Sequence, residues 1–283
     1  MSTAAPATAQ GLLGDTPLRD YTAKLRSFNA FAAPELRRLI ESLELKPGMR
    51  VFDAGCGSGE ALVWLHGAVQ PGGQVQAIDL SAAHVAAART HAVPGIEIFT
   101  GDLLDMPLQP CCMDLVWCIN TINHLRNPLA GVERLQRLLR RGARLALGQS
   151  SLLADMIFAW DARLERVTHE AVRRYYLERY GIDEQQLASV RALVGLLRQA
   201  GLQDISAKTI MIERIAPLDA AALTYIGEAI FRDTWGERLR PYLSTADYLA
   251  LGQVCDPDHP SFALRRPDFH FLQSFTLVSG VAP

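Results

Sequence analysis

The fold of this protein is decided by the stretch Arg-Val-Phe-Asp-Ala-Gly-Cys-Gly-Ser-Gly-Glu, residues 50–60. The apolar Val51 and Phe52 predict a short buried strand that ends at Asp53, and a helical run begins at Glu60. Three glycines lie between them at alternate positions, Gly55, Gly57 and Gly59. Glycine permits positive φ and lets a ligand approach bare backbone N–H groups, and the first turn of a helix offers more of them. The stretch therefore predicts a strand, a glycine loop and a helix that bind a small ligand.

A second acidic residue follows the next predicted strand. The apolar residues 75–78 predict this strand, which ends at Asp79, where nucleoside-binding folds place an acid that holds the ribose hydroxyls. The glycine spacing differs from the G-x-G-x-x-G dinucleotide pattern, and Asp53 would repel a pyrophosphate. A carboxylate beside the turn suits the cationic end of a ligand. The pattern therefore predicts a nucleoside ligand that has no pyrophosphate.

This order of strand, acid, triple glycine, helix, strand and acid resembles the class I S-adenosylmethionine-dependent methyltransferases of the small-molecule type. The resemblance implies S-adenosyl-L-methionine as the cofactor. It places the loop glycines against the methionine part of the cofactor, Asp79 at its ribose and Leu80 beside that acid. Two other interpretations are an ordinary strand-to-helix turn and an NAD(P)-dependent oxidoreductase, which the glycine spacing and Asp53 disfavour.

The composition narrows the class of protein. The chain has 283 residues, enough for one large domain or two. Its formal net charge of −2 and its 49% hydrophobic residues indicate a globular protein and argue against a basic nucleic-acid-binding surface. No apolar run approaches the ~18 residues of a membrane span, and the start lacks the features of a signal peptide. Five cysteines without a C-x-x-C pair indicate reduced thiols and no metal site. We expect a cytoplasmic protein without nucleic-acid or membrane partners; a homodimer stays open.

The N-terminal part, residues 1–45, is predicted to be a leader and lid helices. Residues 1–14 are expected to form a mobile leader, and residues 20–45 show helical spacing, with Pro34 suited to the first turn of a second helix. In the methyltransferase family such a segment often closes over the cofactor. The resemblance therefore makes Tyr21 and Phe28 candidates for cofactor contacts, although aromatic residues at helical spacing can also be core residues.

The next two strands carry further candidates for the cofactor site. Residues 96–100 predict the third strand, which is followed by Asp102 and Leu103. The resemblance places Asp102 at the adenine amino group and Leu103 on the ring, whereas the simpler alternative is that Asp102 caps a turn. Residues 113–119 predict the fourth strand. At its end, Cys118 and Asn120 are expected to face the methionine part of the cofactor and the methyl acceptor.

The remaining elements complete an α/β, Rossmann-like architecture. Strands are predicted at residues 143–148, 205–212 and 270–280, with a helix at residues 185–200. The resemblance implies a seven-stranded sheet of order 3-2-1-4-5-7-6 in a methyltransferase domain that spans residues 46–283. Two helical insertions are expected, at about residues 152–184 and 216–268. Because loops at the carboxyl ends of strands cover the ligand crevice, the first insertion is a candidate cap over the acceptor.

His124 is the best candidate for a catalytic base. An imidazole just beyond the fourth strand can take a proton near neutral pH. Residues 120–124 resemble the phosphoethanolamine N-methyltransferases, in which the matching histidine pairs with a tyrosine of the N-terminal segment, so Tyr21 is the candidate partner. The alternative is a structural, hydrogen-bonded histidine. The predicted function is methyl transfer to an O, N or C nucleophile of a small molecule, such as an aromatic natural product; a non-catalytic cofactor- or partner-binding protein is the alternative.

Overall fold

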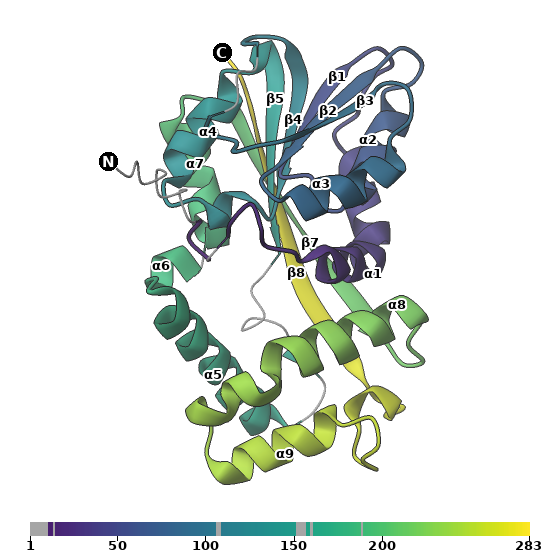
Figure 1. Ribbon diagram of the computed structural model, residues 1–283, viewed down its shortest axis with the longest axis vertical. Helices are drawn as coiled ribbons and strands as arrows, with labels where there is room; N and C mark the ends of the chain where they lie inside the picture. Colours follow the sequence, from purple (N-terminus) through teal and green to yellow (C-terminus); the bar gives the residue numbers. More distant parts are fainter. Residues whose placement is uncertain (1–10, 14, 106–108, 151–156, 159–160, 188) are drawn as a thin grey trace, which may run out of the picture.

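The computed structural model describes residues 11–13, 15–105, 109–150, 157–158, 161–187 and 189–283. Its centre is a single mixed sheet (Figure 1), whose strands lie in the order β3-β2-β1-β4-β5-β8-β6, with β7 paired to β8. The strands are β1 (Arg50–Ala54), β2 (Gln74–Asp79), β3 (Ile96–Thr100), β4 (Met113–Ile119), β5 (Leu139–Ser150), β6 (Ile157–Phe158), β7 (Gln203–Ile215) and β8 (His270–Val281). The first five pair in parallel, and β8 runs antiparallel to β5, β6 and β7. Without the two-residue β6, this is the predicted order 3-2-1-4-5-7-6, with β7 as the sixth strand and β8 as the seventh.

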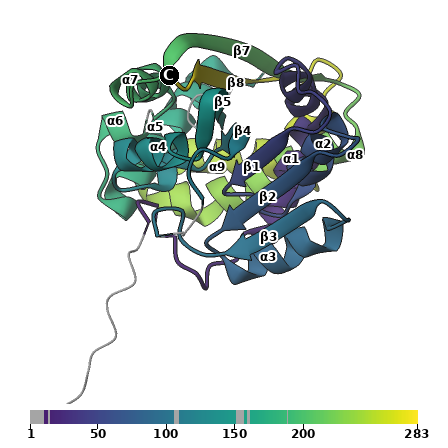
Figure 2. The same cartoon turned by 90° about the horizontal axis from the view of Figure 1, so that it is seen from above.

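Helices cover both faces of the sheet, as Figure 2 shows. One face is covered by α1 (Thr22–Glu41), α2 (Glu60–Ala68) and α3 (Ala82–Ala88), and the other by α4 (Pro128–Gln136) and α7 (Leu193–Gln199). Each strand contributes side chains to the cores on both faces, because successive side chains point to opposite sides of the sheet. In β4, Leu115 and Trp117 join the core on the α1 side, whereas Val116 and Cys118 join the core on the α4 side. Successive β4 side chains therefore lie on opposite faces of the sheet, and those on one face cannot contact what lies on the other.

The segment before β1 contains one long helix, so the prediction of two helices was wrong. Pro34 lies inside α1 and the helix continues through it. Proline removes one backbone donor from a helix and by itself favours a break. The buried face of α1 continues on both sides of Pro34, from Phe31 to Ile40, and packs into the core of the sheet. Glu35 on this face forms a buried ion pair with Arg214 of β7 (2.9 Å). Tertiary packing therefore outweighs the local cost of the proline.

Two further boundaries differ from the predictions. The helix expected over residues 185–200 is divided into α6 (Glu184–Leu187), a 3₁₀ turn (Ser189–Ala192) and α7. The first insertion is not helical throughout, since β6 precedes its long helix α5 (Ala162–Tyr180). β6 has this conformation because it pairs with residues 271–272 of β8. Residues 151–156 and 159–160 of the insertion lie outside the described part.

The second insertion and α5 form a helical lobe below the carboxyl ends of the parallel strands (Figure 1). The lobe contains α8 (Ala220–Leu223), a π-helix (Thr224–Trp235), a 3₁₀ segment (Gly236–Tyr242) and α9 (Thr245–Cys255). Its contact with the sheet domain is aromatic: Tyr225 stacks on Phe31 of α1 at 4.5 Å between ring centroids and lies 5.6 Å from Phe28. Across the described ranges, no helix is both long and apolar enough to span a membrane.

Candidate active site

The glycine loop after β1 has the positive φ angles that the three glycines permit. Gly55, Gly57 and Gly59 have φ angles of +83°, +54° and +91°, a region that side chains rarely tolerate. A Cβ on Gly55 would lie 2.2 Å from Thr121 Oγ1, so the loop also needs glycine for space. The N–H groups of Gly55 and Cys56 both donate to Ile78 O (2.9 Å), which joins the loop to the end of β2.

Asp79 organises the neighbouring strand end. Its Oδ2 accepts from the Gly57 N–H (2.9 Å), and its Oδ1 accepts from the Ser81 N–H (2.9 Å). Oδ1 also contacts His84 Nδ1 at 3.0 Å. Three separate groups therefore hold this carboxylate in one orientation at the cavity edge.

Asp53 provides a second carboxyl group in the same cavity. Its side chain lies on the cavity floor and the residue is only 2% exposed. Burial, followed by the nearby charge of Asp79, raises the pKa of Asp53 to about 8. A buried carboxyl group whose ionisation is disfavoured by a neighbouring carboxylate suits a ligand that carries positive charge.

A cavity of about 340 Å³ lies over these residues, at the carboxyl ends of β1, β2 and β4. Most of the residues predicted for the cofactor or for catalysis line it: Tyr21, Phe28, Asp53, Gly55, Gly57, Asp79, Leu80, Asp102, Leu103, Asn120 and His124. Parallel strands bring these scattered positions together because their carboxyl ends share one edge of the sheet. Among the described residues, no group of three or more His, Cys, Asp or Glu side chains could hold a metal ion.

Two predicted cofactor residues do not line the cavity. Cys118 is 1% exposed and packs into the core on the α4 side, because its neighbours Trp117 and Ile119 take the cavity side of β4. Gly59 lies where the loop packs on α3: a Cβ there would come within 2.7 Å of the Ala88 Cα. The third glycine therefore allows helix packing and is not a cavity residue.

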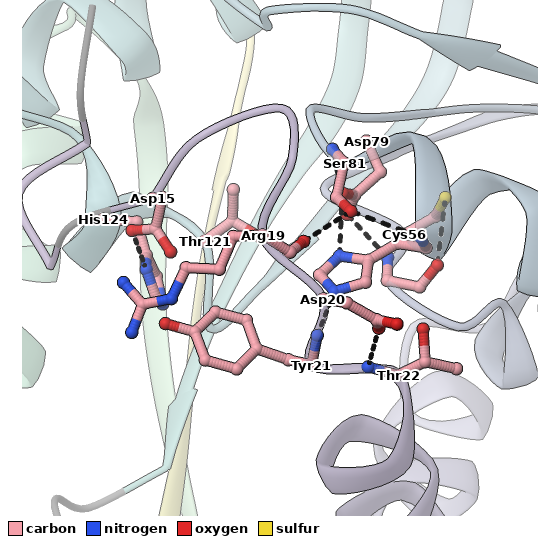
Figure 3. Close-up of polar contacts among 12 residues, drawn as sticks. Asp15, Arg19, Asp20, Tyr21, Thr22, Cys56, Asp79, Ser81, Thr121 and His124 are labelled. Atoms are coloured by element: carbon pink, nitrogen blue, oxygen red, sulfur yellow. Dashed lines mark hydrogen bonds and ion pairs between the residues drawn. The ribbon is translucent and has the colours of Figure 1, made fainter.

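The extended part of the N-terminal segment, which precedes α1, lies along the cavity. We call residues 11–13 and 15–21 the N-terminal strap; residue 14 and residues 1–10 lie outside the described part. At one end the Leu12 N–H donates to His124 O (2.8 Å), so residues 11–13 are not part of a mobile leader. At the other end the Ser81 hydroxyl donates to Arg19 O (2.7 Å), and the Tyr21 N–H donates to His84 Nε2 (3.0 Å). Figure 3 shows the strap between the His124 side and the Asp79 side.

The strap supplies the partner of His124, and it is not the tyrosine that was expected. His124 Nδ1 lies 2.7 Å from Asp15 Oδ2, and both residues line the cavity. Burial raises the pKa of Asp15, but the hydrogen bond and charge of His124, together with Arg19, lower it more, so the pKa lies below its ordinary value. Asp15 is therefore a carboxylate that can only accept, and in neutral His124 the proton sits on Nδ1.

Tyr21 contacts other groups. The Arg19 guanidinium lies over its ring at 4.3 Å, and the His84 ring lies 6.1 Å away (Figure 3). Burial, followed by the charge of Asp15, raises the pKa of Tyr21, so its phenol stays protonated. The prediction that Tyr21 pairs with His124 was wrong because the strap places Asp15 there instead. The sequence signal for Asp15 was only an acid near the N-terminus, and nothing local connected it to a position 109 residues away.

Comparison with known proteins agrees with this geometry. Residues 52–147, from β1 to β5, match the family model described as "Methyltransferase domain". Residues 52–147 therefore carry a methyltransferase domain of the class I S-adenosylmethionine-dependent type. The cofactor of this family, S-adenosyl-L-methionine, is an adenosyl compound that carries a sulfonium and an ammonium group. The two carboxyl groups of the cavity and its bare glycine loop fit such a group.

The relatives match different parts of this chain. An uncharacterized 37.1 kDa protein of transposon TN4556 from Streptomyces fradiae is 34% identical over 39% of this chain, a match that spans only 33% of the relative. The 27-O-demethylrifamycin SV methyltransferase of Amycolatopsis mediterranei is 29% identical over 70% of this chain and 74% of its own length. The fold is shared with phosphoethanolamine N-methyltransferase 2 of Haemonchus contortus (TM-score 0.55, 16% identity, 93% of this chain and 58% of that chain).

Proposed function

We propose that this protein transfers a methyl group to a small molecule. Of the oxygen, nitrogen and carbon nucleophiles that such enzymes use, we propose that the acceptor is a hydroxyl oxygen. The observation that carries the proposal is the Asp15–His124 pair (2.7 Å) beside the cofactor cavity. A base is needed only where the acceptor must lose a proton, and a hydroxyl is such an acceptor. The relative from Amycolatopsis mediterranei, whose name describes O-methylation of a rifamycin, supports this choice.

The cofactor would lie across the strand ends. Asp79 would hold the ribose hydroxyls, Asp102 the adenine amino group and Leu103 one face of the ring. Asp102 Oδ1 already accepts from the Leu104 N–H (2.8 Å), so one carboxylate oxygen caps the turn and the other can serve adenine. Asp53 and the glycine loop would face the methionine part. When bound, S-adenosylmethionine supplies an electrophilic methyl group on a sulfonium.

His124 would remove the acceptor proton. Because Asp15 engages Nδ1, the lone pair of His124 lies on Nε2, which is the atom that can accept a proton from a hydroxyl group. Asp15 then stabilises the imidazolium that forms, since its lowered pKa keeps it ionised. The strap also reduces water access to the cavity, which strengthens these electrostatic interactions.

The acceptor site would include aromatic surface from the helical lobe. Phe28 lines the cavity and contacts Tyr225 of the π-helix. Arg19 of the strap lies near Tyr180 at the end of α5, and Tyr180 lies 5.7 Å from Tyr176 between ring centroids. This surface suits an aromatic or polyketide-like acceptor. The lobe would thus be the acceptor cap that the sequence suggested.

Methyl incorporation into a panel of phenolic and polyketide-like acceptors tests the proposal, with release of S-adenosylhomocysteine as the readout. His124→Ala should lower kcat by about a hundredfold or more while changing cofactor affinity little. Asp15→Asn should give a smaller loss in kcat, because it perturbs the orientation and charge stabilisation of His124 without removing the base.

The chain offers a matched control in His270, whose Nε2 pairs with Glu213 at 2.8 Å on the exposed surface. His270→Ala should retain wild-type turnover. Equal losses of turnover and cofactor affinity in His124→Ala would make that histidine structural. Tight cofactor binding without turnover on any acceptor would favour the non-catalytic alternative.

A further inference from the structure

His84 lies at the junction between the cofactor site and the N-terminal strap. It is on α3, the helix that follows Asp79 and its loop, and it is 8% exposed. One ring nitrogen, Nδ1, contacts Asp79 Oδ1 at 3.0 Å, and the other, Nε2, lies 3.0 Å from the backbone nitrogen of Tyr21. Both sides of one imidazole are thus used, the first by the predicted ribose acid and the second by the strap.

The partners determine where the ring proton lies. A backbone N–H can only donate, so His84 Nε2 must accept from Tyr21. Nδ1 must then carry the proton and donate it to the Asp79 carboxylate. His84 is therefore neutral, with the proton on Nδ1, and a second proton on Nε2 would break the bond to Tyr21. The ring couples the positions of Asp79 and Tyr21. If either partner moves, its hydrogen bond to the ring is lost unless the ring moves with it.

We propose that His84 is a positioning residue that couples cofactor binding at Asp79 to closure of the N-terminal strap. The proposal rests on the proposed function, since it takes Asp79 as the ribose-binding acid. Ribose hydroxyls that engage Asp79 hold its carboxylate in place, and this fixes His84 so that Nε2 faces Tyr21. Tyr21 precedes the first residue of α1, and the same strap carries Asp15 to His124. Cofactor binding thereby favours the position of Asp15 in which the base is oriented.

The strap has other attachments, and none of them uses one side chain to contact both the strap and the cofactor acid. Its ends bind the carbonyl of His124 through Leu12 and the hydroxyl of Ser81 through Arg19. The Ala82 N–H donates to Pro17 O at 3.3 Å. These contacts hold the strap near the cavity with or without a ligand. Ser81 also joins the two, but it reaches Asp79 through its backbone N–H, which lies in the turn before α3. Among the hydrogen bonds of the described strap, His84 is the residue whose side chain contacts both the strap and the Asp79 carboxylate.

Two substitutions separate the two sides of the imidazole. In His84→Asn the amide NH₂ can take the place of Nδ1 and donate to Asp79, but nothing accepts from the Tyr21 N–H. In His84→Gln the amide oxygen can take the place of Nε2 and accept from Tyr21, but the donor to Asp79 is lost. We expect His84→Gln to weaken S-adenosylhomocysteine binding by roughly three- to tenfold, and His84→Asn to change it less than about twofold.

Hydrogen exchange measures the strap. In the wild type, S-adenosylhomocysteine should slow exchange of the amides of residues 15–21, and both variants should lose most of this ligand-dependent slowing. His84→Asn should also show faster exchange at Tyr21 without ligand. ¹⁵N NMR of labelled histidine should show His84 protonated on Nδ1 and not on Nε2.

Three results would overturn the coupling: undiminished ligand-dependent slowing in both variants, equal loss of cofactor affinity in both, or a proton on Nε2. The first and second would make His84 a packing residue of α3. The NMR result does not depend on a ligand, so it tests the bridge separately from the proposed function. A wild-type protein that does not bind S-adenosylhomocysteine would overturn both proposals.

Discussion

Binding of S-adenosylhomocysteine should strengthen steeply from about pH 6 to about pH 8, because the buried Asp53 carboxyl must ionise to meet the ammonium group of the ligand. Burial and the charge of Asp79 raise the pKa of Asp53 to about 8. Without ligand, the protonated form therefore predominates at neutral pH. A cation beside Asp53 favours the ionised form, so binding should release a proton.

The magnitude follows from the fraction of the free protein in which Asp53 is ionised. With a pKa of about 8, this fraction is roughly 1% at pH 6, roughly 9% at pH 7 and roughly half at pH 8. If the complex keeps Asp53 ionised throughout, the apparent affinity rises roughly fiftyfold over this range. Near pH 7, roughly 0.9 proton leaves the protein for each ligand bound.

Isothermal titration calorimetry at several pH values, in two buffers of different ionisation enthalpy, measures both the affinity and the released protons. Asp53→Asn should bind more weakly at high pH, with little pH dependence and almost no proton release. His124→Ala is the control, because it removes an imidazole that lines the same cavity but lies outside the proposed ion pair. An unchanged slope and proton release in Asp53→Asn would refute the reasoning.

Three more outcomes are expected. Gly55→Ala should destabilise the protein by about 2 kcal/mol or more and abolish cofactor binding, because φ is +83° at this position and the new Cβ would meet Thr121 Oγ1. Thermal melting measures the stability and calorimetry the binding. Unchanged cofactor binding in this variant would contradict the argument. The pKa of Asp53 is raised to about 8 in the folded protein, so its contribution to stability is full below the pKa of the unfolded chain and is lost as the pH rises toward about 8. The melting temperature of the free wild type should therefore fall more than that of Asp53→Asn between about pH 5 and about pH 8. Parallel falls of the two melting temperatures would refute this. Arg214→Met should cost about 3 kcal/mol in urea unfolding because it leaves the buried Glu35 without its main partner, and the further change Glu35→Met should recover much of that loss.

The glycine loop and the acids at the strand ends could be predicted because each depends on residues close in sequence. Asp53, the glycines and Glu60 occupy one strand, turn and helix, and Asp79 ends the next strand. Cys118 could have been placed correctly as well. The two-residue period of a buried strand puts Trp117 and Ile119 on the opposite face, so assigning all of the strand end to the site ignored that period.

By itself, the sequence determined the order of the strands, the glycine turn and the acids of the cofactor site, because these follow from short-range patterns and from one regular topology. The tertiary structure alone decided that His124 pairs with Asp15, that His84 bridges Asp79 and Tyr21, and that α1 continues through Pro34. The two histidine contacts to the strap join residues 109 and 63 positions apart. Local propensity says nothing about such pairs, since the packing of the whole chain brings them together.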